Sequence, residues 1–157
     1  MLLKRLKKGT RAGEKGQSMV EFVLVLPIFL LLLFAIVDFG MGLHAWITVT
    51  NSAREGARFG SVRAPATGAC DNNPSTPATN IKCRVTETAG SLPGSSTCPP
   101  LCVTITNAQG TPGQSVVVKT DYDYTLITPI DNILRLISGG TVGPKLKFSS
   151  TADMRLE

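Results

Sequence analysis

A long apolar run near the N-terminus dominates the pattern of hydrophobic and polar positions. From Phe22 to Val37 sixteen residues follow one another without a charge, and the apolar stretch reaches about 20 residues when its flanks are included. As a helix, Phe22–Val37 measures about 24 Å, slightly less than the ~30 Å hydrocarbon core of a bilayer. We therefore expect a transmembrane helix whose flanking carboxylates, Glu21 and Asp38, lie near the two interfaces, where they reach water.

Pro27 lies inside this run. A proline removes one backbone hydrogen bond and tends to kink a helix, and a membrane helix tolerates this when its neighbours satisfy the freed carbonyl. Two interpretations stay open. The proline is a tolerated kink, or it opens the helix locally so that the segment leaves lipid and repacks against other subunits.

The helical pattern continues past the apolar run, because no proline occurs from Leu43 to Arg63. At 100° per residue one stripe of this segment is apolar and mostly small: Trp46, Val49, Ala53, Gly56, Ala57, Gly60 and Ala64. Such a face needs a partner surface, which we expect to be the protein's own sheet. Close helix packing between subunits through Gly56-x-x-x-Gly60 is the alternative. Arg54 and Arg58 lie on a second stripe, which we expect to face solvent.

Residues 65–112 change character and are rich in Pro, Gly, Ser, Thr and Asn. Ile81, Val85 and Ala89 are spaced for a short helix within this region. All four cysteines fall here: Cys70, Cys83, Cys98 and Cys102. Outside the cytoplasm disulfides are their expected state. Of the three possible connectivities we favour Cys70–Cys83 with Cys98–Cys102, because each closes the shorter loop.

The last third of the chain alternates apolar and polar residues with the period of a β-strand. Two long segments of this kind run from Val116 to Leu126 and from Leu146 to Leu156, and a shorter one holds Leu101, Val103 and Ile105. The pattern predicts a small antiparallel sheet.

A short helix is predicted between the two long strands, opened by Thr128-Pro129 and closed by Gly139-Gly140. We expect its apolar residues to face inward: Ile130, Ile133, Leu134 and Ile137. The strands, this helix and the stripe from Trp46 to Gly60 then form one modest core. The fold class is α+β, with a long N-terminal transmembrane helix that continues into an amphipathic helix packed on the sheet.

Charge changes this picture only at the N-terminus. Residues 1–16 carry six cations and one anion, whereas the remaining 141 residues carry ten of each, so the net charge of +5 belongs to the first segment. Clustered Lys and Arg before an apolar run usually mark the cytoplasmic side of a membrane helix. A nucleic-acid binder needs a basic patch on its folded domain. We therefore expect no nucleic-acid partner.

No enzyme signature is present in the sequence. It has one histidine and lacks the HExxH, GxSxG and P-loop motifs. A zinc site is disfavoured, because the cysteines form no CxxC pair and His44 lies on the distant helix. Asp121 and Asp123 would face solvent and lack the glycine and glutamate of a calcium loop. We expect no catalytic residue, no cofactor, no metal and no small-molecule substrate.

The order of basic segment, Gly16, Glu21 and apolar helix resembles the prepilin signal of type IV pilins, and more closely that of the Tad/Flp branch. In those proteins a prepilin peptidase cuts after the glycine, so the resemblance implies cleavage between Gly16 and Gln17. Glu21 would then pair, inside a shared helical bundle, with the freed α-amine of a neighbouring subunit. The alternative is a carboxylate that stays hydrated at the inner interface.

Further motifs make the resemblance specific. Glu21-Phe22, Leu26-Pro27, Asp38-Phe39-Gly40 and the segment 51–58 resemble the TadE-like family, minor pilin-like proteins of the Tad (tight adherence) pilus system. The similarity is strong over 16–63, moderate over 114–157 and absent over 65–112. Phe22 stands where the major Flp pilins carry tyrosine, which favours the minor, TadE-type branch. The resemblance implies assembly or interaction roles for Glu21, Phe22, Pro27 and Asp38.

These observations predict a pilin-like plan with a basic prepilin leader (1–16), a transmembrane helix (17–42), an amphipathic extension (43–64) and an extracytoplasmic α+β domain (65–157) with a disulfide-rich loop (65–112). We expect a structural pseudopilin in the bacterial inner membrane, with its N-terminus cytoplasmic, or after assembly in an extracellular pilus. Its expected partners are the membrane, a prepilin peptidase, other pilins or pseudopilins and the Tad assembly platform. The alternative is an uncleaved single-pass envelope protein that presents an extracytoplasmic binding domain.

Overall fold

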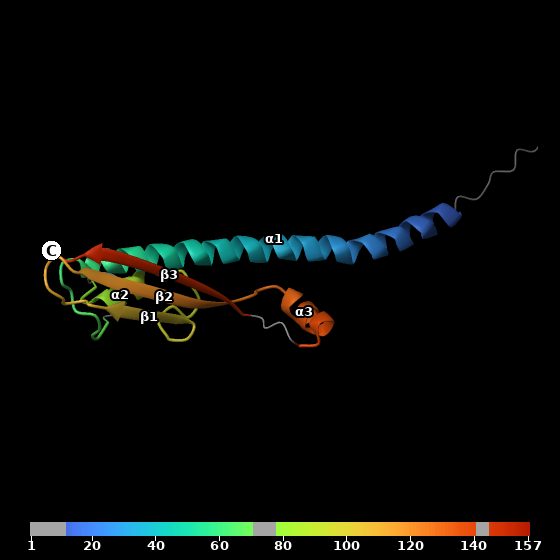
Figure 1. The fold of residues 1–157 in the computed structure, drawn as a ribbon. Helices are drawn as coiled ribbons and strands as arrows, with labels where there is room; N and C mark the ends of the chain where they lie inside the picture. The colour runs from blue at the N-terminus through green and yellow to red at the C-terminus, as the bar shows by residue number, and fades with distance from the viewer. Residues whose placement is uncertain (1–11, 71–77, 141–144) are drawn as a thin grey trace, which may run out of the picture.

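The computed structural model describes residues 12–70, 78–140 and 145–157, and Figure 1 shows one long helix with a small sheet packed along its C-terminal half. The elements in chain order are α1 (Ala12–Gly60), α2 (Ile81–Thr88), β1 (Leu101–Thr106), β2 (Ser115–Thr125), α3 (Ile130–Ser138) and β3 (Lys145–Arg155). The expected α+β class is confirmed. The expected leader, residues 1–16, lies largely outside the described residues.

The sheet is antiparallel and has the order β1-β2-β3, so β2 is its central strand. Val118 of β2 lies opposite Ile105 of β1 and Ala152 of β3. Burial along β2 alternates residue by residue, because successive side chains of a strand point to opposite faces of the sheet. The period-2 pattern therefore predicted all three strands to within about one residue.

Helix α1 is continuous through Pro27, and Figure 1 shows it bending gently in its N-terminal part. The proline therefore does not interrupt the helix of the single chain. The helix ends at Gly60, four residues before the expected end of the extension at Ala64. Residues 61–63 form a turn in which Arg63 takes a left-handed conformation (φ 61°). Since Pro65 disfavours helical geometry in the preceding residue, the chain turns here and brings Ala64 into the core.

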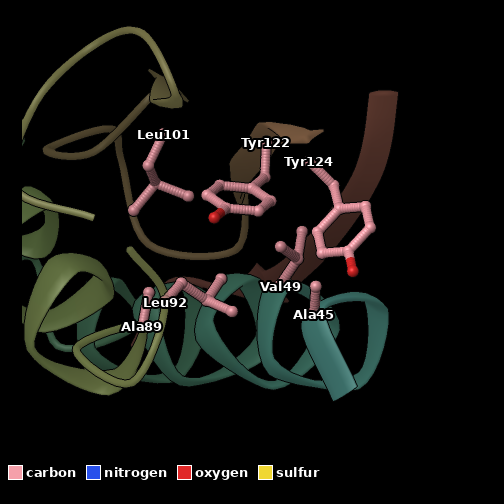
Figure 2. Packing of buried hydrophobic residues seen from close by; sticks show 7 residues of the cluster. All are labelled: Ala45, Val49, Ala89, Leu92, Leu101, Tyr122 and Tyr124. Carbon is pink, nitrogen blue, oxygen red and sulfur yellow. The ribbon is translucent and has the colours of Figure 1, made fainter. Parts of the chain in front are cut away.

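The buried face of α1 differs from the expected stripe at one position. Trp46 is 49% exposed, whereas its neighbour Ala45 is buried. Figure 2 shows Tyr122 and Tyr124 of β2 lying over α1 beside Ala45 and Val49, so the side of the helix that carries Ala45 faces the sheet. The expectation that Trp46 packs on the sheet was wrong. The first core cluster contains Ala45, Val49, Ala89, Leu92, Leu101, Tyr122 and Tyr124.

The second core cluster lies near the C-terminal end of α1, where Ala57 meets α2 and the sheet. Gly56 faces α2 so closely that an added Cβ would lie 2.4 Å from Cγ2 of Val85. An added Cβ on Gly60 would lie 3.0 Å from Cδ1 of Ile81 and 3.1 Å from Cγ2 of Val116. The Gly56-x-x-x-Gly60 face is therefore filled by the protein's own domain. The alternative of helix packing between subunits at this face was wrong.

Helix α3 was expected in the core and lies outside it. Its described side chains belong to neither cluster: Ile130 and Ile133 are half-buried and Leu136 is 85% exposed. The side chains of Leu134 and Ile137 lie outside the described residues. Figure 1 shows α3 beyond the end of the sheet, on the side of the N-terminal half of α1. Helices α1 and α2 already cover the apolar face of the sheet, so α3 is not needed to bury it.

Candidate functional site

The N-terminal half of α1 is an apolar rod that the described part of the chain leaves largely uncovered. It is long and apolar enough to cross a membrane, and its most apolar stretch is not buried by any described part of the chain. Large side chains along it are exposed, such as Phe22, Phe29 and Ile36. Because exposing so much contiguous apolar surface to water is unfavourable, this half of the helix is compatible with single-pass membrane anchoring.

The residues expected in processing and assembly lie at the start of this rod. Gly16 and Gln17 are exposed and already helical, and nothing lies within 4 Å of a Cβ added to Gly16. Glu21 is exposed one turn later, and no salt bridge to it occurs among the described residues. Phe22 is 62% exposed. These side chains are accessible to another protein, and the domain covers none of them.

Asp38 lies where the apolar rod meets the domain, and it is 5% exposed. Its Oδ1 accepts hydrogen bonds from the backbone N–H groups of Ile127 (3.1 Å) and Thr128 (3.3 Å), and its Oδ2 accepts one from the Thr128 hydroxyl. The Tyr124 hydroxyl donates to the Asp38 carbonyl at 3.4 Å. We call these four residues the Asp38 junction. The expectation that the Asp38 carboxylate reaches water was wrong, because it is buried and binds the segment that leaves β2.

Burial and the nearby Asp38 carboxylate raise the pKa of the Tyr124 phenol above its usual value. Tyr124 therefore stays a hydrogen-bond donor under ordinary conditions. The ring of Tyr124 also lies against that of Phe148 on β3, with 5.8 Å between ring centroids. The junction thus connects α1, β2 and β3 at the end of the domain that is nearest the apolar rod.

A pocket of about 350 Å³ opens beside the junction. His44 of α1, Pro100 and Tyr122 are among the residues that line it, and the lining is mostly apolar. Among the described residues no group of three or more His, Cys, Asp or Glu side chains could hold a metal ion. Asp121, expected to face solvent, is half-buried, and hydrogen bonding to Ser149 lowers the pKa of its carboxyl.

Two disulfides fasten the loop region: Cys70–Cys83 and Cys98–Cys102. These are the pairs that the shorter-loop argument favoured. Cys83 lies in the first turn of α2, where the side chain of Asn80 accepts a hydrogen bond from its backbone N–H at 2.9 Å. The first disulfide therefore ties the chain that leaves α1 to the capped start of α2. The second joins the turn at 98–100 to the first residues of β1.

An ion-pair network that the sequence analysis did not identify holds α2 against α1. Glu55 of α1 accepts hydrogen bonds from Arg58, one turn along, and from Arg84 of α2, with Oε1–Nη2 distances of 3.0 and 2.6 Å. Hydrogen bonding to Arg58 and Arg84 lowers the pKa of Glu55 to about 2. Glu87 extends the network through Arg84 at 3.3 Å. The contact joins residues 29 positions apart, so no local spacing could have indicated it.

In a comparison with known protein families, the matching residues all lie within α1. Residues 16–58 match the model of a family described as TadE-like protein, which confirms the resemblance drawn from the motifs. The match covers less than a third of the chain and contains Gly16, Glu21, Asp38 and most of the face that packs on the sheet. No curated protein and no solved structure matches the chain.

Proposed function

We propose that this TadE-like chain is a structural, membrane-anchored minor pilin of a Tad-type pilus, in the bacterial inner membrane with its N-terminus in the cytoplasm. One observation carries the proposal: the part of the chain that matches the family contains the apolar stretch that the described residues leave uncovered. Lipid covers this surface before assembly, and other pilin helices cover it afterwards. No catalytic chemistry is required of such a subunit.

The proposed division of labour follows the domain plan. The leader directs insertion and processing, the exposed half of α1 anchors and assembles the subunit, and the domain from residue 38 onward is the part carried into or beneath the pilus. The Asp38 junction sets the boundary a few residues before the expected extension at 43–64, because the domain already binds the helix at Asp38.

Processing between Gly16 and Gln17 is the part of the proposal that is easiest to test. Glycine costs an α-helix about 1 kcal/mol relative to alanine, so the helix opens most easily there and the peptide can extend into a protease groove. Mass spectrometry of the mature N-terminus, in hosts with and without a prepilin peptidase, should find Gln17 first only when the peptidase is present. The uncut protein should be heavier by about 1.8 kDa, from ~110 Da for each of the lost residues.

Gly16→Val should block this trimming, and Gly40→Val is its matched control. Gly40 is a second glycine of α1 with nothing within 4 Å of an added Cβ, so the same substitution adds the same bulk away from the cut. Normal trimming of Gly16→Val would contradict the proposed cleavage site. A chain that begins at Met1 whether or not the peptidase is present would instead support the second candidate, an uncleaved envelope anchor. That candidate is favoured by the helical state of the Gly16–Gln17 peptide in the single chain.

The proposed location of the domain outside the cytoplasm is tested by the oxidation state of its cysteines. All four cysteines are paired in the structure, and such pairs persist in oxidising compartments. Alkylation of the denatured, unreduced protein purified from cells should therefore add no label. Uptake of four labels would place the domain in the cytoplasm.

A further inference from the structure

We propose that α3 is a membrane-surface helix that lies in the interface of the same bilayer that α1 spans, on the side of the domain. The inference rests on the membrane span of the proposed function. It concerns a second contact between this chain and lipid, made by the segment between β2 and β3.

The position of α3 is set by the Asp38 junction. Asp38 directly follows the apolar run, at the level where the span leaves lipid, and it binds the backbone of Ile127 and Thr128. Two residues later α3 begins, and Figure 1 shows it on the side of the N-terminal half of α1. Of the described helices and strands, α3 contacts only α1. The helix is therefore held at or just below the depth where headgroups meet acyl chains.

The chemistry of α3 fits this depth. With 100° between residues, the described side chains divide into an apolar side (Ile130, Ile133 and Leu136) and a polar side (Asn132, Arg135 and Ser138). Leu136 is 85% exposed and Ile127, just before the helix, is 61% exposed, although both are large and apolar. A strongly amphipathic helix of this kind lies in a membrane interface with its apolar side buried roughly 5–10 Å.

Charge next to α3 favours lipid over a protein surface. Lys145 and Lys147, at the start of β3, are both exposed and lie at the same end of the sheet as the junction. Asp123 lies opposite Lys147 in the strand register and offsets part of that charge. Lysine stems reach along an interface while their ammonium groups bind lipid phosphates. The apolar surface of α3 also continues that of the span, so one bilayer covers both.

Tryptophan fluorescence in brominated bilayers tests the proposal on the full-length chain. Trp46→Phe removes the sole native tryptophan. In that background we would compare Leu136→Trp with Val62→Trp, an exposed site at the far end of α1, and with Phe29→Trp in the span. Ile127→Trp is a second reporter beside α3. The bilayers contain phosphatidylcholine and phosphatidylglycerol brominated near the carbonyl end of their acyl chains.

We expect tryptophan at 136 and at 127 to lose most of its fluorescence in the brominated bilayers, and tryptophan at 62 to lose none. Tryptophan at 29 reports the span itself and should be quenched most by lipids brominated deeper in the chain. Quenching at 29 without quenching at 136 and 127 overturns the α3 proposal and leaves the span intact. A blue-shifted, unquenched signal at 136 that depends on protein concentration overturns it in favour of a second copy of the chain. Absence of quenching at 29 overturns the span and the α3 proposal together.

Discussion

The backbone N–H of Thr128 donates a hydrogen bond to Oδ1 of Asp38 at 3.3 Å, across ninety positions of sequence. This contact fixes the end of the apolar half of α1 against the strand at the centre of the sheet. The same carboxylate also binds Ile127 and the Thr128 hydroxyl, so one side chain satisfies three donors. The position of the domain relative to the apolar half of α1 depends on this residue.

Replacing Asp38 with alanine should destabilise the domain by about 2–4 kcal/mol, because three donors at a buried site lose a charged acceptor. Asp38→Asn keeps one acceptor oxygen and the size of the side chain, so it should cost about half as much. Thermal unfolding in detergent micelles, followed by circular dichroism, measures both. Asp153→Ala, at an exposed position of β3, is the control and should leave the melting temperature unchanged. Equal melting temperatures for Asp38→Ala and the parent would show that the junction is not a stabilising contact.

Gly56→Ala should destabilise the protein by about 1–3 kcal/mol, because the new Cβ would lie 2.4 Å from Val85 Cγ2 in a packed core. Gly42→Ala is the matched control in the same helix. Its nearest neighbour is 3.8 Å from the added Cβ, so the gain in helix propensity should leave the stability equal or up to about 1 kcal/mol higher. The two melting temperatures should move in opposite directions, and a parallel shift would argue against close packing of α1 on α2.

The stability of the domain should fall in acid partly through Glu55. Its pKa is about 2 in the folded protein against an ordinary 4.5, so its contribution is complete above pH 4.5 and is lost as the pH falls toward 2. Glu55→Gln cannot titrate and should flatten the dependence of the melting temperature on pH in that window. Arg84→Gln removes one of its partners and should flatten the dependence in part. A profile of Glu55→Gln that coincides with that of the parent would exclude this network as a source of acid sensitivity.

Glu21→Gln should leave insertion and trimming normal and abolish pilus assembly or co-purification with other pilins. The exposed carboxylate lies within an apolar rod, and burying it among other helices without a partner would cost several kcal/mol. A new N-terminal Gln17 can cyclise to pyroglutamate, so the mass of the terminus should be measured alongside assembly. If the Gln variant assembles as well as the parent, the prediction is contradicted and Glu21 is a hydrated residue at the membrane interface.

Much of the fold was predictable because it depends on local periodicity. Alternation along β2 and β3, the spacing of Ile81 and Val85 in α2, and the long run of α1 each specify an element without knowledge of its neighbours. The pairing of cysteines followed from loop length for the same reason.

What the sequence did not reveal depends on contacts between distant segments. Trp46 and Ala45 are adjacent on the helix, and only the two tyrosine rings of β2 decide which of them faces the sheet. Asp38 was interpreted as a water-facing carboxylate because its partners, at 127 and 128, are neither charged nor near in sequence. The prediction that the apolar residues of α3 face the core was wrong. An amphipathic pattern indicates that a helix has a partner surface, but it does not identify that surface.

The chain from Asp38 of α1 to Ser61, just after the helix, is hydrogen-bonded to the rest of the domain at both ends. At one end Asp38 binds the chain after β2, and at the other the Ser61 carbonyl accepts a hydrogen bond from the N–H of Glu157 at 3.0 Å. A force that pulls the N-terminal half of the helix along its axis therefore acts at the same time on the Asp38 and Ser61 hydrogen bonds and on the two core clusters. It acts on them as shear, parallel to the helix. Because many contacts share this force, a pull on the helix should move the whole domain while it stays folded.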